Sequence, residues 1–250
     1  MRIFHGFDHL PGFRWPAATV GSYDGVHGGH RELLSEVCRL AHEHGGESVV
    51  VTFAPHPRIV LEPATDLRLL TTLDEKAYLL DRAGIDNLVV VPFTREFSRT
   101  SPEDFIRRDL AGRLGVRALV MGYNHHFGRN KEGGYESSQS LYARSGMEVH
   151  EIGKVDVGGE KVSSTVVRTL VEHGRMDRAA RLLNHPYLLI ADVHDGRIFA
   201  ADPYKLLPPP GDYPVTANGD PTTLFIPADG LPRLGRPVTC RHCIIEFSAI

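Results

Sequence analysis

Cysteine, tryptophan and long apolar runs are all scarce in this chain of 250 residues, which has three cysteines and one tryptophan. Three cysteines cannot build a disulfide framework, so a reducing compartment is the default expectation. The longest apolar runs, such as 49–51 and 88–91, are far too short to span a bilayer. The N-terminus has no apolar signal-peptide core either. We therefore expect a cytoplasmic protein without a membrane partner.

The net charge is also small, because the chain has 28 Lys and Arg residues and 31 Asp and Glu residues, which give a formal charge of −3. A protein that binds long nucleic acids needs a broad basic surface, so we expect no nucleic-acid partner. A small anionic ligand can still be held by a local site. The length suits one large domain or two small ones, and it leaves the oligomeric state open. One surplus is evident, since the chain has 14 histidines.

Short apolar runs alternate with helical patterns up to Pro186. Strands are expected at 18–22, 48–53, 87–92, 117–122 and 148–152. Their continuous apolar character is typical of parallel strands that are covered on both faces. Helices are expected over 33–41 and from Ser101 and Ser164 onward, with Ser101 as an N-cap before Pro102. The alternation predicts an α/β fold with a doubly wound parallel sheet over residues 1–186.

After Pro186 the helical periodicity disappears and proline-rich turns separate short strand-like pieces. These pieces lie at 187–193, 213–216, 224–226 and 243–247. We expect a small β-rich C-terminal domain over 187–250 that leans on the first domain or on a partner chain. Cys240 and Cys243 form a single C-x-x-C without the second ligand pair of a structural zinc site or the helix of a redox site. We interpret them as small residues of an edge strand.

The most informative stretch runs from Gly21 to His30 and reads Gly-Ser-Tyr-Asp-Gly-Val-His-Gly-Gly-His. It lies between the first expected strand and a helix, which is where doubly wound folds bind phosphates through backbone N–H groups and the helix dipole. His27 and His30 can both face such an anion and stabilise charge on a transferring phosphoryl group. By spacing alone, a glycine turn with two exposed histidines or a lone metal pair fits equally well.

His27-Gly28-Gly29-His30 matches the His-x-Gly-His signature of the nucleotidylyltransferase superfamily. The whole block resembles bacterial FAD synthetase, the adenylylating part of the bifunctional riboflavin kinase/FMN adenylyltransferase family. Further segments resemble the family in the same order, at 52–57, 70–76, 92–97, 105–107, 121–128 and 159–168. The resemblance spans about residues 17 to 186 and implies a Rossmann-like nucleotidylyltransferase fold.

The resemblance implies ATP-dependent adenylylation of FMN to FAD, with release of pyrophosphate and with Mg²⁺ neutralising the leaving group. It implies these catalytic residues: His27, His30, Ser164, Thr165 and Arg168. It implies nucleotide contacts by Gly21, Ser22, Tyr23, Asp24 and Gly29, and FMN contacts by Phe53, His56, Pro57, Arg58 and Asn124. Hydroxyls at a helix N-terminus and an arginine one turn later suit phosphate. In a purely structural interpretation, Ser164 is an N-cap and Arg168 a solvated residue.

Two departures from the family pattern keep alternatives open. His126 stands where the family frequently has arginine, which suggests adenylyl transfer to a different phosphate-bearing acceptor as one alternative. His125-His126 as a metal pair is disfavoured, because adjacent loop residues seldom ligate one ion. The tail lacks the Gly-Phe-Pro-Thr-Ala-Asn run of riboflavin kinase, so we expect no kinase activity. The short tail also suggests a non-catalytic flavin- or nucleotide-binding paralogue, against which the intact motifs speak. Ten histidines remain, including His42, His44 and His173, and we expect them on the surface or in packing.

Overall fold

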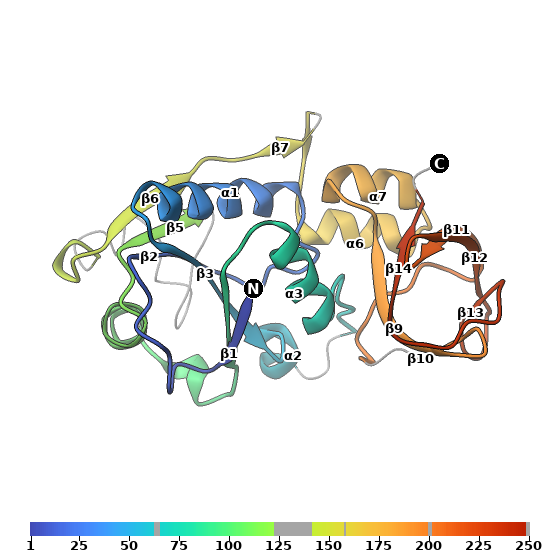
Figure 1. Ribbon diagram of the computed structural model, residues 1–250, viewed down its shortest axis with the longest axis horizontal. Coiled ribbons are helices and arrows are strands. Elements are labelled where there is room, and N and C mark those ends of the chain that lie inside the picture. The colour runs from blue at the N-terminus through green and yellow to red at the C-terminus, as the bar shows by residue number, and fades with distance from the viewer. Residues whose placement is uncertain (63–65, 123–141, 158, 200–201, 249–250) are drawn as a thin grey trace. The chain divides into compact units, whose positions relative to one another are not determined.

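The computed structural model describes residues 1–62, 66–122, 142–157, 159–199 and 202–248 (Figure 1). Asn124, His125 and His126 lie outside these residues. The chain forms two compact units. Unit 1 comprises Met1–Tyr23, His30–Asp66 and Leu79–Val155, and unit 2 comprises Asp24–Gly29, Leu67–Tyr78 and Asp156–Ile250. No helix in the described part of the chain is long and apolar enough to cross a membrane.

Unit 1 is built on a six-stranded parallel sheet with the strand order β1-β4-β3-β2-β5-β6. Its strands are β1 (Arg2–His5), β2 (Pro16–Val20), β3 (Glu47–Ala54), β4 (Asn87–Pro92), β5 (Ala118–Gly122) and β6 (Glu148–Ile152). The predicted parallel sheet is confirmed, although β1 was not predicted. That strand lies at the sheet edge and is mostly exposed, so it lacks the apolar run by which the other strands were identified. Because β2 lies between β3 and β5, the strand order reverses beside β2.

Helices connect these strands, namely α1 (Gly28–Glu43), α2 (Pro57–Leu61), α3 (Leu73–Arg82), the 3₁₀ turn η1 (Phe97–Arg99), α4 (Pro102–Asp104) and the π-helical η2 (Phe105–Arg113). The expected apolar stripe of α1 is buried, with Val37 and Leu34 at 0% and 1% exposure. Ser101 is the N-cap of α4, as predicted, and its Oγ accepts a hydrogen bond from the Asp104 N–H at 3.0 Å.

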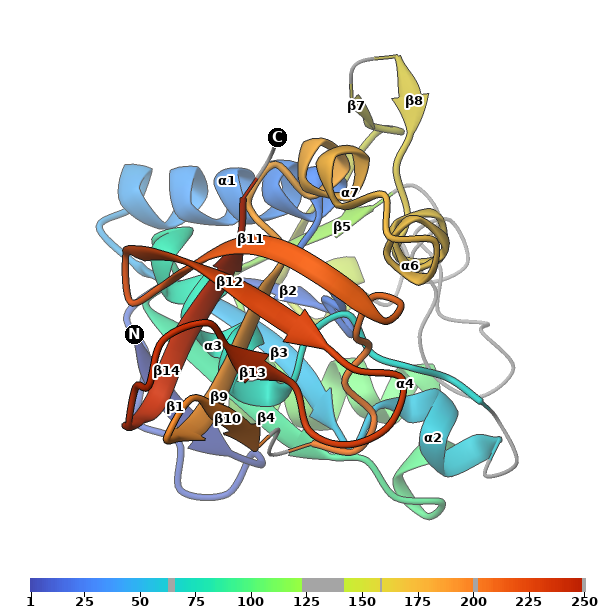
Figure 2. The ribbon, with the colours of Figure 1, turned by 90° about the vertical axis from the view of Figure 1, so that its right-hand side faces the viewer.

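Unit 2 contains a closed six-stranded antiparallel barrel with the order β10-β13-β12-β11-β14-β9 (Figure 2). Its strands are β9 (Leu188–His194), β10 (Arg197–Phe199), β11 (Gly211–Ala217), β12 (Asp220–Ile226), β13 (Arg233–Leu234) and β14 (Cys240–Phe247). The predicted β-rich tail is confirmed, but the edge-strand interpretation of Cys240 and Cys243 is wrong. β14 is not an edge strand of the closed barrel, because it pairs with β9 at Cys240 and Cys243 and with β11 over residues 245–247.

The barrel shares one hydrophobic core with the two helices that precede it, α6 (Ser164–Glu172) and α7 (Met176–Leu183). Val167 and Leu183, from the two helices, belong to the same buried cluster as Leu224 and Ile245 of the barrel. A short hairpin of β7 (Asp156–Val157) and β8 (Glu160–Lys161) comes before α6. The barrel therefore packs against helices that precede Pro186 in the chain. A domain boundary at Pro186 stays a prediction.

A buried ion pair joins the segment 67–78 to the barrel within unit 2. Lys205 Nζ donates to Glu75 Oε2, to the Leu70 carbonyl and to the Leu188 carbonyl, each at 2.7 Å. The Glu75 carboxylate also accepts the Thr72 N–H at 2.8 Å, while the Glu75 N–H is donated to Thr72 Oγ1, which is a capping box at the start of α3. The buried charges are thus paired and hydrogen-bonded, as burial requires.

Candidate active site

The loop after β2 begins at the point where the strand order of the sheet reverses. In open α/β sheets, ligands bind outside the carboxyl ends of the strands at such a point. The Gly21 N–H donates to the Val51 carbonyl at 3.0 Å, which extends the β2–β3 pairing by one residue. The Ser22 carbonyl accepts Thr52 Oγ1 at 3.4 Å. The ends of β2 and β3 are therefore tied together where the chain leaves the sheet.

Tyr23 is a buried residue that supports His30. Its ring centroid lies 4.9 Å from that of His30, and 3% of Tyr23 is exposed. The Thr19 hydroxyl donates its proton to the Val120 carbonyl, so the phenol of Tyr23 donates to Thr19 Oγ1 at 2.6 Å. Burial raises the pKa of Tyr23, which keeps the phenol neutral. The structure thus gives Tyr23 a packing role, and a direct nucleotide contact stays a prediction.

The Asp24 carboxylate is held within unit 2 by partners that are distant in the sequence. Arg168 Nη2 donates to Asp24 Oδ2 at 2.9 Å, and the Thr71 N–H donates to Oδ1 at 3.0 Å. Only 4% of the Asp24 side chain and 13% of the Arg168 side chain are exposed. Arg168 Nε also donates to the Arg68 carbonyl at 2.7 Å. The interpretation of Arg168 as a solvated residue is therefore wrong, while a direct bond from it to phosphate stays a prediction.

The backbone of the same loop is fixed by three further side chains. The Asp24 carbonyl accepts a hydrogen bond from the Ser164 hydroxyl at 2.8 Å. The Gly25 N–H donates a hydrogen bond to Thr71 Oγ1 at 3.0 Å, and the Gly25 carbonyl oxygen lies 3.0 Å from His185 Nε2. Gly25 has φ +83°, and a Cβ there would lie 2.8 Å from a Leu70 methyl carbon, so only glycine fits. These bonds determine the path of the loop immediately before His27.

The start of α6 supplies Ser164 to this loop because another serine caps the helix. Ser163 is the N-cap, and its Oγ accepts the Val166 N–H at 3.3 Å. The interpretation of Ser164 as the N-cap is therefore wrong, since its hydroxyl donates to the Asp24 carbonyl instead. Thr165, the next residue, is exposed. The structure thus brings Ser164, Arg168 and Asp24 together, as members of one hydrogen-bonded group.

His27 is 8% exposed, so the interpretation of this turn as two exposed histidines is wrong for it. Burial lowers the pKa of His27 to about 4; the nearby Asp24 carboxylate opposes this shift and His185 adds to it. The ring is therefore neutral at neutral pH. A Cβ on Gly29 would lie 3.1 Å from a Val162 methyl carbon and in ordinary contact, at 3.4 Å, with two atoms of the His27 ring. His27 belongs to unit 2, and His30 belongs to unit 1.

The segment expected to contact FMN lies after β3 in unit 1. His56 is the N-cap of α2, where its Nδ1 accepts the Arg58 N–H at 3.2 Å, and Pro57 is the first residue of the helix. The exposed Arg58 side chain pairs with Glu62 one turn later, at 3.4 Å. The Phe53 ring lies in an aromatic cluster, 5.6 and 5.9 Å from the centroids of two other phenylalanine rings. Flavin contacts by these residues stay predictions.

Sequence reasoning missed three residues that surround the Asp24–Gly29 loop. Thr71 bonds both Asp24 and Gly25, and it lies in a segment that resembles the family but had no role assigned. Lys76 is 6% exposed, and burial lowers its pKa to about 8, although Asp24 opposes the shift. His185 is 160 residues away from Gly25 in the chain, so no local pattern could reveal their contact.

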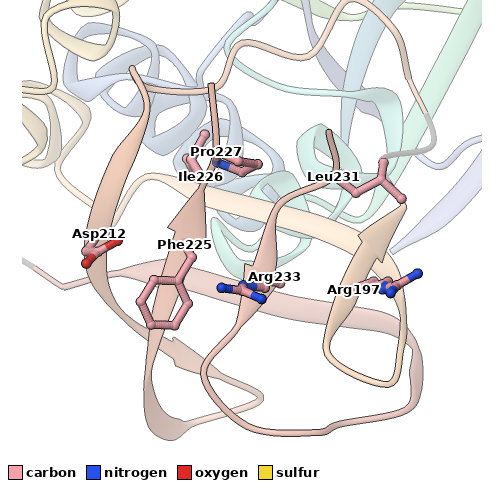
Figure 3. A pocket seen from close by; sticks show the side chains of 7 residues that line it. All are labelled: Arg197, Asp212, Phe225, Ile226, Pro227, Leu231 and Arg233. Carbon is pink, nitrogen blue, oxygen red and sulfur yellow. The ribbon is translucent and has the colours of Figure 1, made fainter. Parts of the chain in front are cut away.

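A cavity of about 490 Å³ lies on the barrel (Figure 3). It is lined by Arg197, Asp212, Phe225, Ile226, Pro227, Leu231 and Arg233. Arg197 and Arg233 are directly opposite each other on β10 and β13, and the Arg233 guanidinium lies 5.6 Å from the centroid of the Phe225 ring. No motif in the sequence predicted this cavity, and we assign it no role in the chemistry below. Among the residues that the structure describes, no three His, Cys, Asp or Glu side chains gather into a metal site.

Comparison with known sequences identifies one family. The sequence model of the family described as FAD synthetase matches residues 14–166. A bifunctional riboflavin kinase/FMN adenylyltransferase of Listeria monocytogenes serovar 1/2a is 34% identical over 179 residues, which cover 71% of this chain and 56% of the relative. One from Pseudomonas fluorescens is 33% identical, with 80% and 64% coverage. A protein named FAD synthetase, also from L. monocytogenes serovar 1/2a, is 29% identical and covers 78% of each chain.

The aligned region spans about 56–64% of the length of these two bifunctional relatives. Among solved structures, the crystal structure described as a macrolide-efflux protein from Streptococcus pneumoniae superimposes with a TM-score of 0.79. It covers 99% of this chain and 90% of that chain at 19% sequence identity. At this identity the likeness shows that both units of the chain have the fold of a known structure.

Proposed function

The chain belongs to the FAD synthetase family, and from this premise we propose that it transfers the adenylyl group of ATP to FMN. A phosphate oxygen of FMN attacks the α-phosphorus of ATP, the bond from that phosphorus to the bridging oxygen breaks, and FAD and pyrophosphate form. We further propose that it acts in the cytoplasm. We also propose that it has no riboflavin kinase activity, because the kinase loop is missing from the tail.

The loop Asp24–Gly29 is the observation that supports this proposal best. Thr71, Ser164, Arg168 and His185 contact its polar groups and hold it in one path, with His27 buried at its end. Phosphoryl and nucleotidyl transfer need little covalent chemistry from the protein, so positioning and electrostatic stabilisation supply most of the catalysis. A loop fixed from several sides before substrate arrives suits that requirement.

His27 and His30 are the residues that we propose to stabilise the charge on the α-phosphate. The neutral ring of His27 donates one N–H to a phosphate oxygen. This hydrogen bond strengthens as negative charge develops on the phosphate oxygen that accepts it. At the N-terminus of α6, Ser164 donates to a phosphate oxygen through its backbone N–H, because its hydroxyl already donates to the Asp24 carbonyl, and Thr165 donates through its backbone N–H and its hydroxyl. Arg168 adds positive charge and holds Asp24.

Mg²⁺ belongs to the proposed reaction through the phosphates of ATP. When bound, it neutralises charge on the leaving pyrophosphate. Mg²⁺ usually keeps several waters and binds through substrate phosphates and one or two carboxylates. Asp24 is buried and paired with Arg168, so it does not fit the role of a metal ligand. We therefore assign no residue of this chain to the ion.

On the acceptor side we propose that Phe53, His56, Pro57, Arg58 and Asn124 contact FMN, and that Gly21, Ser22, Tyr23, Asp24 and Gly29 shape the nucleotide pocket. Among the residues proposed to contact FMN, Arg58 has a guanidinium that is held only by a surface ion pair, because its side chain and that of Glu62 are both exposed. Exchange of that weak pair for a bond to the FMN phosphate costs little.

The decisive experiment separates the reaction products by HPLC after incubation with FMN and Mg-ATP, and with riboflavin and Mg-ATP in parallel. We expect FAD and pyrophosphate from FMN, and no FMN from riboflavin. If pyrophosphate were released with another phosphomonoester but not with FMN, that compound and not FMN would be the acceptor. Flavin binding without any pyrophosphate release would show a non-catalytic paralogue.

His30→Ala tests the catalytic assignment. We expect the variant to fold and to bind FMN, with turnover reduced at least about 100-fold, because a donor aimed at the developing charge is lost. His42→Ala, on the exposed side of α1, is the matched control and should retain full activity. Full activity of His30→Ala would contradict the mechanism.

A further inference from the structure

The ring of His185 lies between two backbone carbonyl groups. Its Nε2 is 3.0 Å from the Gly25 oxygen, and its Nδ1 is 2.7 Å from the Pro186 oxygen. A carbonyl oxygen only accepts hydrogen bonds, so each contact needs an N–H on the ring. A neutral imidazole has one N–H, whereas an imidazolium has two. Both bonds can therefore exist together only when His185 is protonated.

The bond to Gly25 orients the peptide that leads directly into Val26 and His27. This peptide is trans, so its carbonyl and its N–H point in opposite directions. A carbonyl anchored on His185 thus sets the direction of the Val26 N–H as well. Val26 has φ +42°, an unfavourable conformation for a β-branched residue. Such a conformation persists only where the surroundings over-determine it, and His185 is one of those surroundings.

The charged and titratable groups around this contact come from three elements. Asp24 and His27 belong to the loop itself, Arg168 to α6 and Lys76 to α3, and Asp24 acts electrostatically on His27 and on Lys76. His185 acts on His27 in the opposite direction, since its positive charge lowers the pKa of His27, which burial has already lowered. Two histidines in one group are thereby driven toward different protonation states.

We propose that His185, as the imidazolium, is a positioning residue that clamps the Gly25–Val26 peptide and holds the buried His27 ring neutral and oriented. The kinetic consequence rests on the proposed function, whereas the protonation state rests on the geometry alone. As pH rises, His185 gives up one of its two protons and one of its two bonds is lost. The rate of adenylyl transfer then falls with the same midpoint.

NMR of the full-length chain labelled with ¹⁵N-histidine tests the clamp without any substrate. The resonances of His185 are those that disappear in His185→Gln. We expect both ring nitrogens of His185 to carry protons at about pH 7, against the ordinary histidine pKa of about 6.5, and the titration of His27 to move to higher pH in His185→Gln. A ring with a single N–H at this pH, or an unchanged His27 titration, would overturn the proposal.

Kinetics across about pH 6 to 9 tests the consequence. The kcat of the wild type should fall toward alkaline pH. In His185→Arg this fall should move to higher pH, because guanidinium keeps its charge. In His185→Gln kcat should be lower by roughly tenfold to a hundredfold and should not fall further as pH rises. His173→Gln is the matched control, since the His173 ring bonds only the Thr169 carbonyl of its own helix among the hydrogen bonds described. Identical pH profiles for wild type and both His185 variants would refute a positioning role. Absence of FAD with wild type would refute the proposed function and leave the NMR result decisive for the clamp.

Discussion

Two segments expected to contact substrate are held in opposite ways. The loop Asp24–Gly29 is bonded to residues that are 46 to 160 positions away in the chain. The segment that begins at His56 is stabilised by neighbours two to four positions away, through the bonds of Arg58 to His56 and Glu62. The loop is therefore fixed by the tertiary structure, whereas α2 is organised by its own local sequence.

This difference follows from what each segment is proposed to do. A group that stabilises developing charge must be in place before the reaction, because reorganisation during the reaction would cost rate. A group that receives a substrate phosphate can exchange a weak surface ion pair for the ligand. We therefore expect substitutions around the loop to cost stability and turnover together, and substitutions at α2 to change FMN affinity with little change in stability.

Arg168→Ala should have the largest effect on stability. It leaves the Asp24 carboxylate buried without its cation, and breaking a buried ion pair costs about 3–5 kcal/mol in the free energy of unfolding. Urea unfolding of wild type and variant measures the difference. Arg168→Ala combined with Asp24→Asn should recover part of the loss, because the buried charge is gone. A loss below about 1 kcal/mol would mean that the pair does not hold the loop.

The free energy of unfolding should fall at acid pH because His27 is buried in its neutral form. Its pKa is about 4 in the folded chain and 6.5 in the reference state, so the unfolded chain binds more protons between these values. Stability is therefore complete above about pH 6.5 and declines as pH falls toward about 4, by roughly 3 kcal/mol in total. Urea unfolding at both ends of this range should show a smaller decline in His27→Gln. His42→Gln, an exposed control, should keep the wild-type decline.

Arg58→Ala should have the smallest effect on stability. The ion pair with Glu62 has side chains that are 51% and 58% exposed, and such pairs contribute roughly 0–1 kcal/mol. The Kd for FMN, measured by flavin fluorescence, should rise by about tenfold or more if Arg58 binds the phosphate. Glu62→Ala is the matched variant, which removes the same pair but keeps the cation. Unchanged FMN affinity in Arg58→Ala would remove this residue from the acceptor site.

Several features of the fold could be predicted because they are local. The parallel strands have continuous apolar runs, Ser101 precedes proline and two acids, and proline-rich turns separate the strands of the tail. The wrong or missing elements are those whose signal is not local. β1 has no apolar run because it lies at an exposed edge, and Cys240 and Cys243 lie in a strand that only barrel closure pairs on both sides.

The sequence by itself determined the alternation of strands and helices, the family and the histidine motif, because these depend on residues that are near one another in the chain. The tertiary structure alone decided that Arg168 binds Asp24 from 144 positions away and that His185 contacts Gly25 from 160 positions away. Periodicity reports only neighbours within a strand or a few helical turns. Which distant side chains meet depends on strand order and chain crossovers, and those are properties of the folded chain.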